Sequence, residues 1–126
     1  MKGGQIQIDD SGALPRDSVS CVQWLPAASP AAAPQFILAS WDGSLRVYTV
    51  GQNSFRQEYL HQCAEPITAF ACQRDASKVY LGLLSGRISC LDVPRAQEQP
   101  FEGRLPHPPR ALFLAEEDSR LFVFDT

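Results

Sequence analysis

Short apolar runs separated by Gly and Pro turn residues recur along the chain and predict β-strands. Apolar and polar side chains alternate after Gly43, over residues 44–50, and again after Gly86, over residues 87–93. Alternation with a period of two places the apolar side chains on one face of a strand. Apolar positions three and four apart, which a surface helix requires, are not sustained anywhere. The pattern therefore predicts an all-β fold.

The runs also repeat at a constant offset of 43 residues. Leu45 and Val50 correspond to Ile88 and Val93, and a second set of matches links Pro66, Phe70 and Asp75 to Pro109, Phe113 and Asp118. A period of about 40–45 residues with several short strands per unit is typical of a WD-repeat β-propeller, in which each blade is a four-stranded sheet. A compact small β-barrel is the alternative all-β fold.

The repeat divides the chain into blades. We expect a closing strand and linker at 1–16, blade one at 17–60, blade two at 61–104 and the start of blade three at 105–126. The alternation Gln5–Ile8 is the candidate closing strand. Propellers usually have four to eight blades, so the sequence predicts the N-terminal two and a half blades of a larger ring. We expect the 26–34 segment, rich in Ala and Pro, to be a surface insertion between two strands.

Composition and charge narrow the range of functions. The 126 residues are 44% hydrophobic and 20% charged, with a net charge of −3, which is typical of a globular protein and offers no basic face for nucleic acid. The apolar runs are far shorter than the roughly 20 residues of a membrane span. Because no apolar leader is apparent, we expect a reducing compartment. The cysteines form no CxxC pair, which favours structural thiols over disulfides or a zinc site: Cys21, Cys63, Cys72 and Cys90.

No arrangement of residues in the sequence indicates catalysis. The acidic segment 116–118 is better explained as a solvated turn than as a pair of catalytic carboxylates. His61 and His107 precede the first strands of blades two and three, where WD repeats commonly have a structural histidine. Cys63 is close to His61, but two such residues are too few to indicate a metal site. We therefore expect no cofactor and no enzymatic activity. The alternative is an enzyme with its active site in the propeller channel, and the fold alone does not indicate whether such a site exists.

The two tryptophans call for separate interpretations. Trp24 lies in the first predicted strand, so we expect it in the core. Trp41 and Asp42 instead lie at a strand end, just before the turn at Gly43. Asp42 is expected to close that turn through its side chain. Trp41 either contacts a binding partner or packs within the sheet, and the sequence pattern leaves both open.

Residues 40–48, Ser-Trp-Asp-Gly-Ser-Leu-Arg-Val-Tyr, carry a resemblance to a known family. With the runs 17–22 and 36–39 before them, they resemble the first blade of the spindle-checkpoint propeller of the Bub (budding uninhibited by benzimidazoles) family. The resemblance is strong over 17–50 and weaker over blade two, where Leu84-Ser85-Gly86 replaces the Trp-Asp pair. The mRNA-export propeller of the nuclear pore has a similar first blade, but there the residue after the tryptophan is usually not Asp.

The resemblance implies a seven-bladed, non-catalytic scaffold of the spindle assembly checkpoint. Its top face would hold GLEBS-type peptide motifs of checkpoint kinases, and members also bind phosphorylated motifs on a kinetochore scaffold. By the motif match, Trp41 is the partner-binding residue. The implied location is the nucleus and kinetochore, with a cytoplasmic pool, and no direct nucleic-acid or membrane partner is expected. The alternative is a nuclear-pore mRNA-export propeller that binds a GLEBS motif on a nucleoporin.

Overall fold

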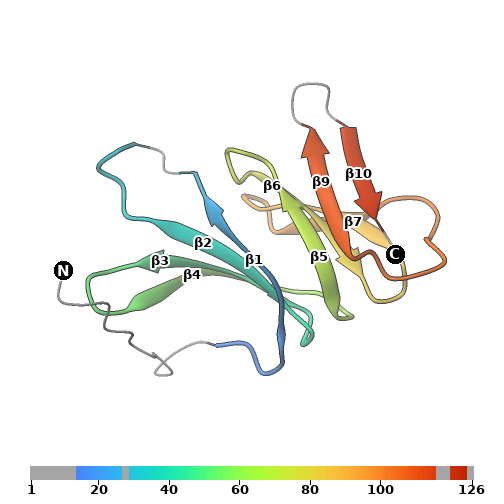
Figure 1. Ribbon diagram of the computed structural model, residues 1–126, viewed down its shortest axis with the longest axis horizontal. Helices are drawn as coiled ribbons and strands as arrows, with labels where there is room; N and C mark the ends of the chain where they lie inside the picture. The colour runs from blue at the N-terminus through green and yellow to red at the C-terminus, as the bar shows by residue number, and fades with distance from the viewer. Residues whose placement is uncertain (1–13, 27–28, 116–119, 125–126) are drawn as a thin grey trace.

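The structure is a computed structural model that describes residues 14–26, 29–115 and 120–124. This part of the chain forms two four-stranded antiparallel sheets and a two-stranded hairpin (Figure 1). In each four-stranded sheet the strands pair in chain order, so each strand is hydrogen-bonded to the one that follows it in the sequence. The strands are β1 (Val19–Leu25), β2 (Gln35–Ser40), β3 (Ser44–Val50), β4 (Phe55–Gln62), β5 (Ile67–Cys72), β6 (Lys78–Leu83), β7 (Ile88–Asp92), β8 (Gln97–Pro100), β9 (Ala111–Ala115) and β10 (Arg120–Phe124).

The 43-residue repeat corresponds to equivalent strands of successive sheets. β3 and β7 are the third strands of blade one and blade two, and each follows a turn glycine in the left-handed region, with φ of 85° at Gly43 and 90° at Gly86. β5 and β9, which contain the matched residues Phe70 and Phe113, are the first strands of their sheets. The all-β prediction and the assignment of repeats to strands are confirmed.

One expected blade boundary differs from the structure, and two predicted segments lie outside the described residues. β4 continues to Gln62, so the last strand of blade one extends two residues past the division expected at 60, and His61 belongs to blade one. The candidate closing strand Gln5–Ile8 and the acidic segment 116–118 lie outside the described residues. In the described part of the chain, no helix is long and apolar enough to cross a membrane.

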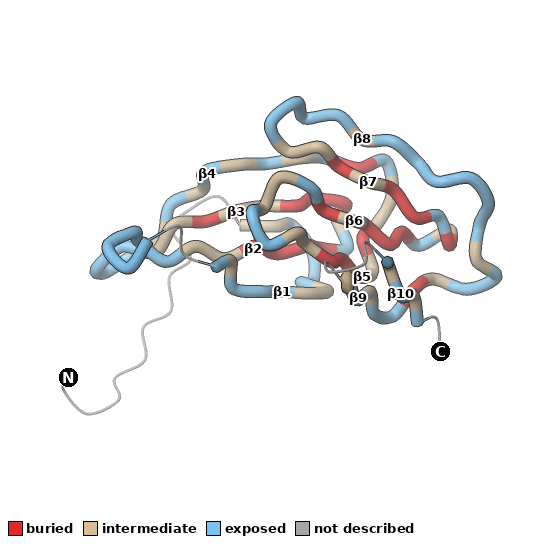
Figure 2. The backbone as a smooth tube through the Cα atoms, turned by 90° about the horizontal axis from the view of Figure 1, so that it is seen from above, coloured by how far each residue is buried: buried red, intermediate tan, exposed pale blue. Residues whose placement is uncertain are grey.

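The hydrophobic core lies between the two blades and continues through blade two. Figure 2 shows the buried backbone along β2 and β3 and along β5, β6 and β7, whereas the outer strands β4 and β8 are more exposed. The first strands β1, β5 and β9 are neighbours, because β5 contacts β1 on one side and β9 on the other. The buried core cluster comprises Ile37, Ala39, Leu45, Cys63, Ile67, Phe70, Val79, Leu81, Leu83 and Leu91.

One hydrogen bond is repeated at both junctions between first strands. The hydroxyl of Ser20 on β1 donates to the carbonyl of Ile67 on β5 at 2.6 Å. The hydroxyl of Thr68 on β5 donates to the carbonyl of Pro109, just before β9, at the same distance. Close packing accompanies the second bond, since a Cβ at Gly82 on β6 would overlap the Pro109 ring. Each blade is therefore joined to the next by a hydroxyl on its first strand.

The prediction that Trp24 lies in the core is wrong. Its side chain is 64% exposed, and Val22 on the same strand is 60% exposed. Trp24 lies on the face of blade one that points away from blade two, and no described sheet packs against that face. It contacts Phe36 edge-on with ring centroids 5.8 Å apart, at one end of an aromatic row that continues through Tyr48 and Phe55.

Candidate functional site

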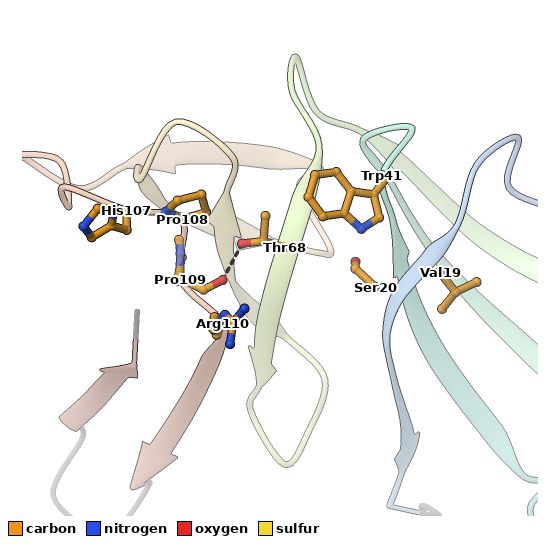
Figure 3. Close-up of a pocket in the computed structure, with 8 residues that line it drawn as sticks. All are labelled: Val19, Ser20, Trp41, Thr68, His107, Pro108, Pro109 and Arg110. Atoms are coloured by element: carbon orange, nitrogen blue, oxygen red, sulfur yellow. Dashed lines mark hydrogen bonds between the residues drawn. The ribbon is translucent and has the colours of Figure 1, made fainter. Parts of the chain in front are cut away.

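Trp41 lies on the turn between β2 and β3, at the end of the sheet. Its backbone N–H donates to the carbonyl of Ser18 at 2.9 Å, which fixes the turn to the chain entering β1. Its side chain is 40% exposed. Figure 3 shows the indole pointing from this turn toward β5 and Thr68. The main chain at Trp41 is thus fixed while much of the indole remains accessible to solvent.

Asp42 closes the turn, as the sequence predicted. One carboxylate oxygen accepts a hydrogen bond from the N–H of Ser44 at 2.8 Å, and the other accepts one from the N–H of Arg16, also at 2.8 Å. Burial alone would raise the pKa of Asp42, but these bonds and one from Ser40 hold its pKa below the ordinary value. The carboxylate therefore stays ionised at neutral pH and holds the chain before β1 against the turn that carries Trp41.

An open groove of about 1020 Å³ lies beside Trp41 (Figure 3). It runs across the first strands of both blades to the segment before β9. The indole and two prolines give it apolar surface, Thr68 contributes a hydroxyl, and Arg110 is the charged side chain of its lining. The groove is lined by Val19, Ser20, Trp41, Thr68, His107, Pro108, Pro109 and Arg110.

Of these lining residues, only Trp41 was singled out by sequence reasoning as a binding residue. His107 was expected to be a structural histidine, but it is exposed and lines the groove. Thr68 and Arg110 were not predicted, because their place in the groove depends on how successive blades pack. The sequence offered one hint for Arg110. This residue directly follows Pro109, which matches Pro66 in the 43-residue repeat.

The equivalent turn of blade two has a different chemistry. Leu84 stands at the position of Trp41, and its side chain is 42% exposed. Ser85 replaces Asp42, and its N–H and hydroxyl both donate to the carboxylate of Glu65, at 2.7 and 3.0 Å. Both turns thus present an apolar side chain to solvent and use one carboxylate to fix the backbone. The aromatic ring and its N–H donor occur in blade one.

A second polar cluster, made of His61, Cys63 and Glu98, does not line the groove. Burial by itself would raise the pKa of the Glu98 carboxylate. Hydrogen bonds from His61, Ser89 and Cys63 nevertheless lower that pKa below its usual value. Burial and the neighbouring Glu98 raise the pKa of the Cys63 thiol far above normal, so the thiol is protonated at neutral pH. The four cysteines all lie in the described part of the chain and form no disulfide there.

The shape of the described chain is similar to a known structure. No family model and no curated protein matches the amino-acid sequence. Among solved structures, it is similar to the structure of U3-55K, with a TM-score of 0.64 and 17% sequence identity over 82% of this chain. U3-55K is a WD-repeat propeller protein. The fold is that of a WD-repeat β-propeller.

The match covers 32% of the U3-55K chain, so this chain spans about a third of that propeller's length. Two complete four-stranded blades and part of a third are present in the described residues. At this level of identity the similarity establishes the fold, and the groove has to be interpreted from its own residues.

Proposed function

We propose that this chain is part of a non-catalytic scaffold that binds an extended peptide motif in the groove beside Trp41. The observation that carries the proposal is the position of the indole. It is 40% exposed, its backbone is fixed by the bond to Ser18, and it borders the groove. Tryptophan is enriched among the residues that dominate binding energy, since it offers a large apolar face and one N–H donor.

The other lining residues suit a peptide. Pro108 and the Trp41 ring provide apolar surface for a side chain of the ligand, and Arg110 provides a cation for an acidic group. The groove is open to solvent, which fits an extended segment better than a small molecule enclosed on all sides. The net charge of −3 gives no support for a nucleic-acid ligand, because its phosphate backbone is bound by basic surfaces.

The specific partner we propose is a GLEBS-type motif of a checkpoint kinase, with a role in the spindle assembly checkpoint at kinetochores. This rests on the resemblance of residues 17–50, and of Ser40-Trp41-Asp42 in particular, to the first blade of the Bub family propeller. A location in the nucleus and at the kinetochore, with a cytoplasmic pool, and binding of kinetochore phosphopeptides belong to the same proposal.

The test is peptide binding by the full chain and by Trp41→Ala, measured by calorimetry with a GLEBS peptide. We expect the substitution to weaken binding by about 30-fold, the effect of losing a hot-spot residue worth about 2 kcal/mol. Trp24→Ala is the matched control, because Trp24 is also exposed but lies outside the groove lining. Its affinity should equal that of the unsubstituted chain.

Two outcomes would contradict the proposal. Binding that Trp24→Ala and Trp41→Ala weaken equally would place the peptide outside the groove, and absence of binding to any GLEBS peptide would reject the ligand. Preference for the nucleoporin peptide over the checkpoint-kinase peptide would instead favour the mRNA-export alternative. The two peptides are therefore titrated side by side.

A further inference from the structure

Three side chains that are separated in sequence meet at the junction of the outer strands of the two blades. His61 is near the end of β4, Cys63 follows that strand, and Glu98 lies on β8 of the next blade. The Nε2 atom of His61 is 2.8 Å from Oε1 of Glu98, and Sγ of Cys63 is 3.4 Å from the same oxygen. One nitrogen, one sulfur and one carboxylate oxygen all lie within 4.8 Å of one another.

The surroundings hold these three groups in place. Cys63 is 5% exposed, and its backbone N–H donates to the carbonyl of Gly43 at 2.8 Å. The side chains of His61 and Glu98 are 14% and 23% exposed. Buried Ser89 on β7 donates a further hydrogen bond to the Glu98 carboxylate. Partners of this kind orient metal ligands in known sites.

The distances can be compared with those of a coordinated ion. Zinc binds histidine nitrogen and carboxylate oxygen at about 2.1 Å and cysteine sulfur at about 2.3 Å. Tetrahedral angles would then place nitrogen and oxygen about 3.4 Å apart, and sulfur and oxygen about 3.6 Å apart. From the observed 2.8 and 3.4 Å, the nitrogen–oxygen pair needs to separate by about 0.6 Å and the sulfur–oxygen pair by about 0.2 Å. Small rotations of the partly exposed His61 and Glu98 side chains supply that movement.

We propose that His61, Cys63 and Glu98 form a binding site for a divalent transition-metal ion of the zinc class, which links blade one to blade two. Thiolate, imidazole and carboxylate together are ligands that suit Zn²⁺ rather than Mg²⁺ or Ca²⁺. On binding, the Cys63 thiol releases its proton to solvent, and the imidazole of His61 coordinates as the neutral ring through Nε2. Three protein ligands leave a fourth position for water. The sequence showed only two of the ligands, since Glu98 comes from the next blade.

The bound ion would also affect the turn that carries Trp41. Cys63 is one hydrogen bond away from Gly43, and the Gln62 side chain donates to the carbonyl of Asp42 at 2.8 Å. An ion that fixes Cys63 thus fixes the segment that supports the β2–β3 turn. The metal site is nevertheless independent of the proposed peptide ligand, because it shares no residue with the groove lining.

The experiment is a Co²⁺ titration of the full chain after treatment with a chelator, followed by absorption spectroscopy. Cobalt reports a thiolate ligand through a near-ultraviolet charge-transfer band and tetrahedral geometry through intense visible bands. We expect both at one equivalent, and we expect Zn²⁺ to displace them. Cys63→Ser should abolish the charge-transfer band, whereas Cys90→Ser should keep it, because Cys90 lies on β7 outside the cluster.

Glu98→Gln provides a second variant that retains an oxygen able to accept the hydrogen bond from His61. It should keep the native circular dichroism spectrum and weaken Co²⁺ binding by more than about ten-fold. If Cys63→Ser does not fold, this variant and the unsubstituted chain decide the question. An absent charge-transfer band in the unsubstituted chain, a band that survives in Cys63→Ser, or one lost equally in Cys90→Ser would overturn the proposal. The cluster would then be a hydrogen-bonded junction without an ion.

Discussion

Blade one and blade two have the same strand order but bury their strands to different extents. Blade two lies between blade one on one side and the β9–β10 hairpin on the other, and Ile67, Leu81 and Leu91 are fully buried. Blade one packs against blade two through one face, while Trp24 and Val22 remain exposed on the other. Equivalent strands therefore differ in burial according to their neighbours. The contribution of a repeat to stability depends on both of its faces being covered.

The largest effect that this comparison predicts is at Leu81, in the centre of blade two. Leu81→Ala removes a side chain with no exposed surface and leaves a cavity between the two blades. We expect the free energy of unfolding to fall by about 2–5 kcal/mol, measured by denaturant titration.

Trp24→Ala is the contrasting substitution in blade one. The Trp24 ring makes one edge-on contact with Phe36. We therefore expect the free energy of unfolding to fall by about 0.5–1 kcal/mol. A loss equal to that of Leu81→Ala would show that the aromatic row of blade one is covered in solution, and the contrast between the blades would fail.

An effect smaller than that of Leu81→Ala is expected at the junction of blade two with the hairpin. Gly82→Ala introduces a methyl group where the Pro109 ring already lies, which should cost about 1–3 kcal/mol through overpacking. Hydrogen exchange should report faster opening of β9 than of β3, since β9 is the strand that must move. Gly51→Ala is the control: its Cβ would lie 3.3 Å from the Ser54 carbonyl oxygen in the exposed turn after β3, so any effect stays in blade one and exchange in β9 should be unchanged.

The last prediction concerns the turn of blade one that Asp42 closes. Asp42→Ala removes the carboxylate that holds Ser44 and Arg16, which should cost about 1.5 kcal/mol at neutral pH. Because the folded-state pKa of Asp42 is lowered, its contribution is complete above the unfolded pKa of about 3.9 and is lost as the pH falls through the lower folded pKa. The unfolding difference between the variant and the unsubstituted chain should shrink below about pH 4. A difference that persists unchanged at pH 2 would show that ionisation of Asp42 is irrelevant to the turn.

Much of the fold follows from local patterns in the sequence. The 43-residue offset matched β3 with β7 and β5 with β9, because alternation and turn glycines are local properties of the sequence. Gly43 and Gly86 both lie in the left-handed region, which favours glycine. The exposure of Trp24 could not be predicted in this way. Alternation says that a strand has an apolar face, but whether a second sheet covers that face depends on the rest of the assembly.

The candidate site was predictable only in part, for a similar reason. Trp41 stands out because it lies at a strand end beside the turn at Gly43, and its motif resembles a known blade. Its groove partners Thr68 and Arg110 come from the next blades, and Glu98 reaches His61 across the junction. Each of these contacts depends on the angle between two sheets, which no local pattern encodes.

The hydrogen bond repeated between the first strands has a consequence for the curvature of the molecule. The hydroxyls of Ser20 and Thr68 each donate to a carbonyl oxygen 2.6 Å away, of Ile67 on β5 and of Pro109 just before β9. The same contact fixes the spacing of successive first strands at both junctions, and together with the core between the blades it limits the rotation from one blade to the next. Removal of either hydroxyl would change the arc that later blades follow, even though every strand within a blade kept its pairing.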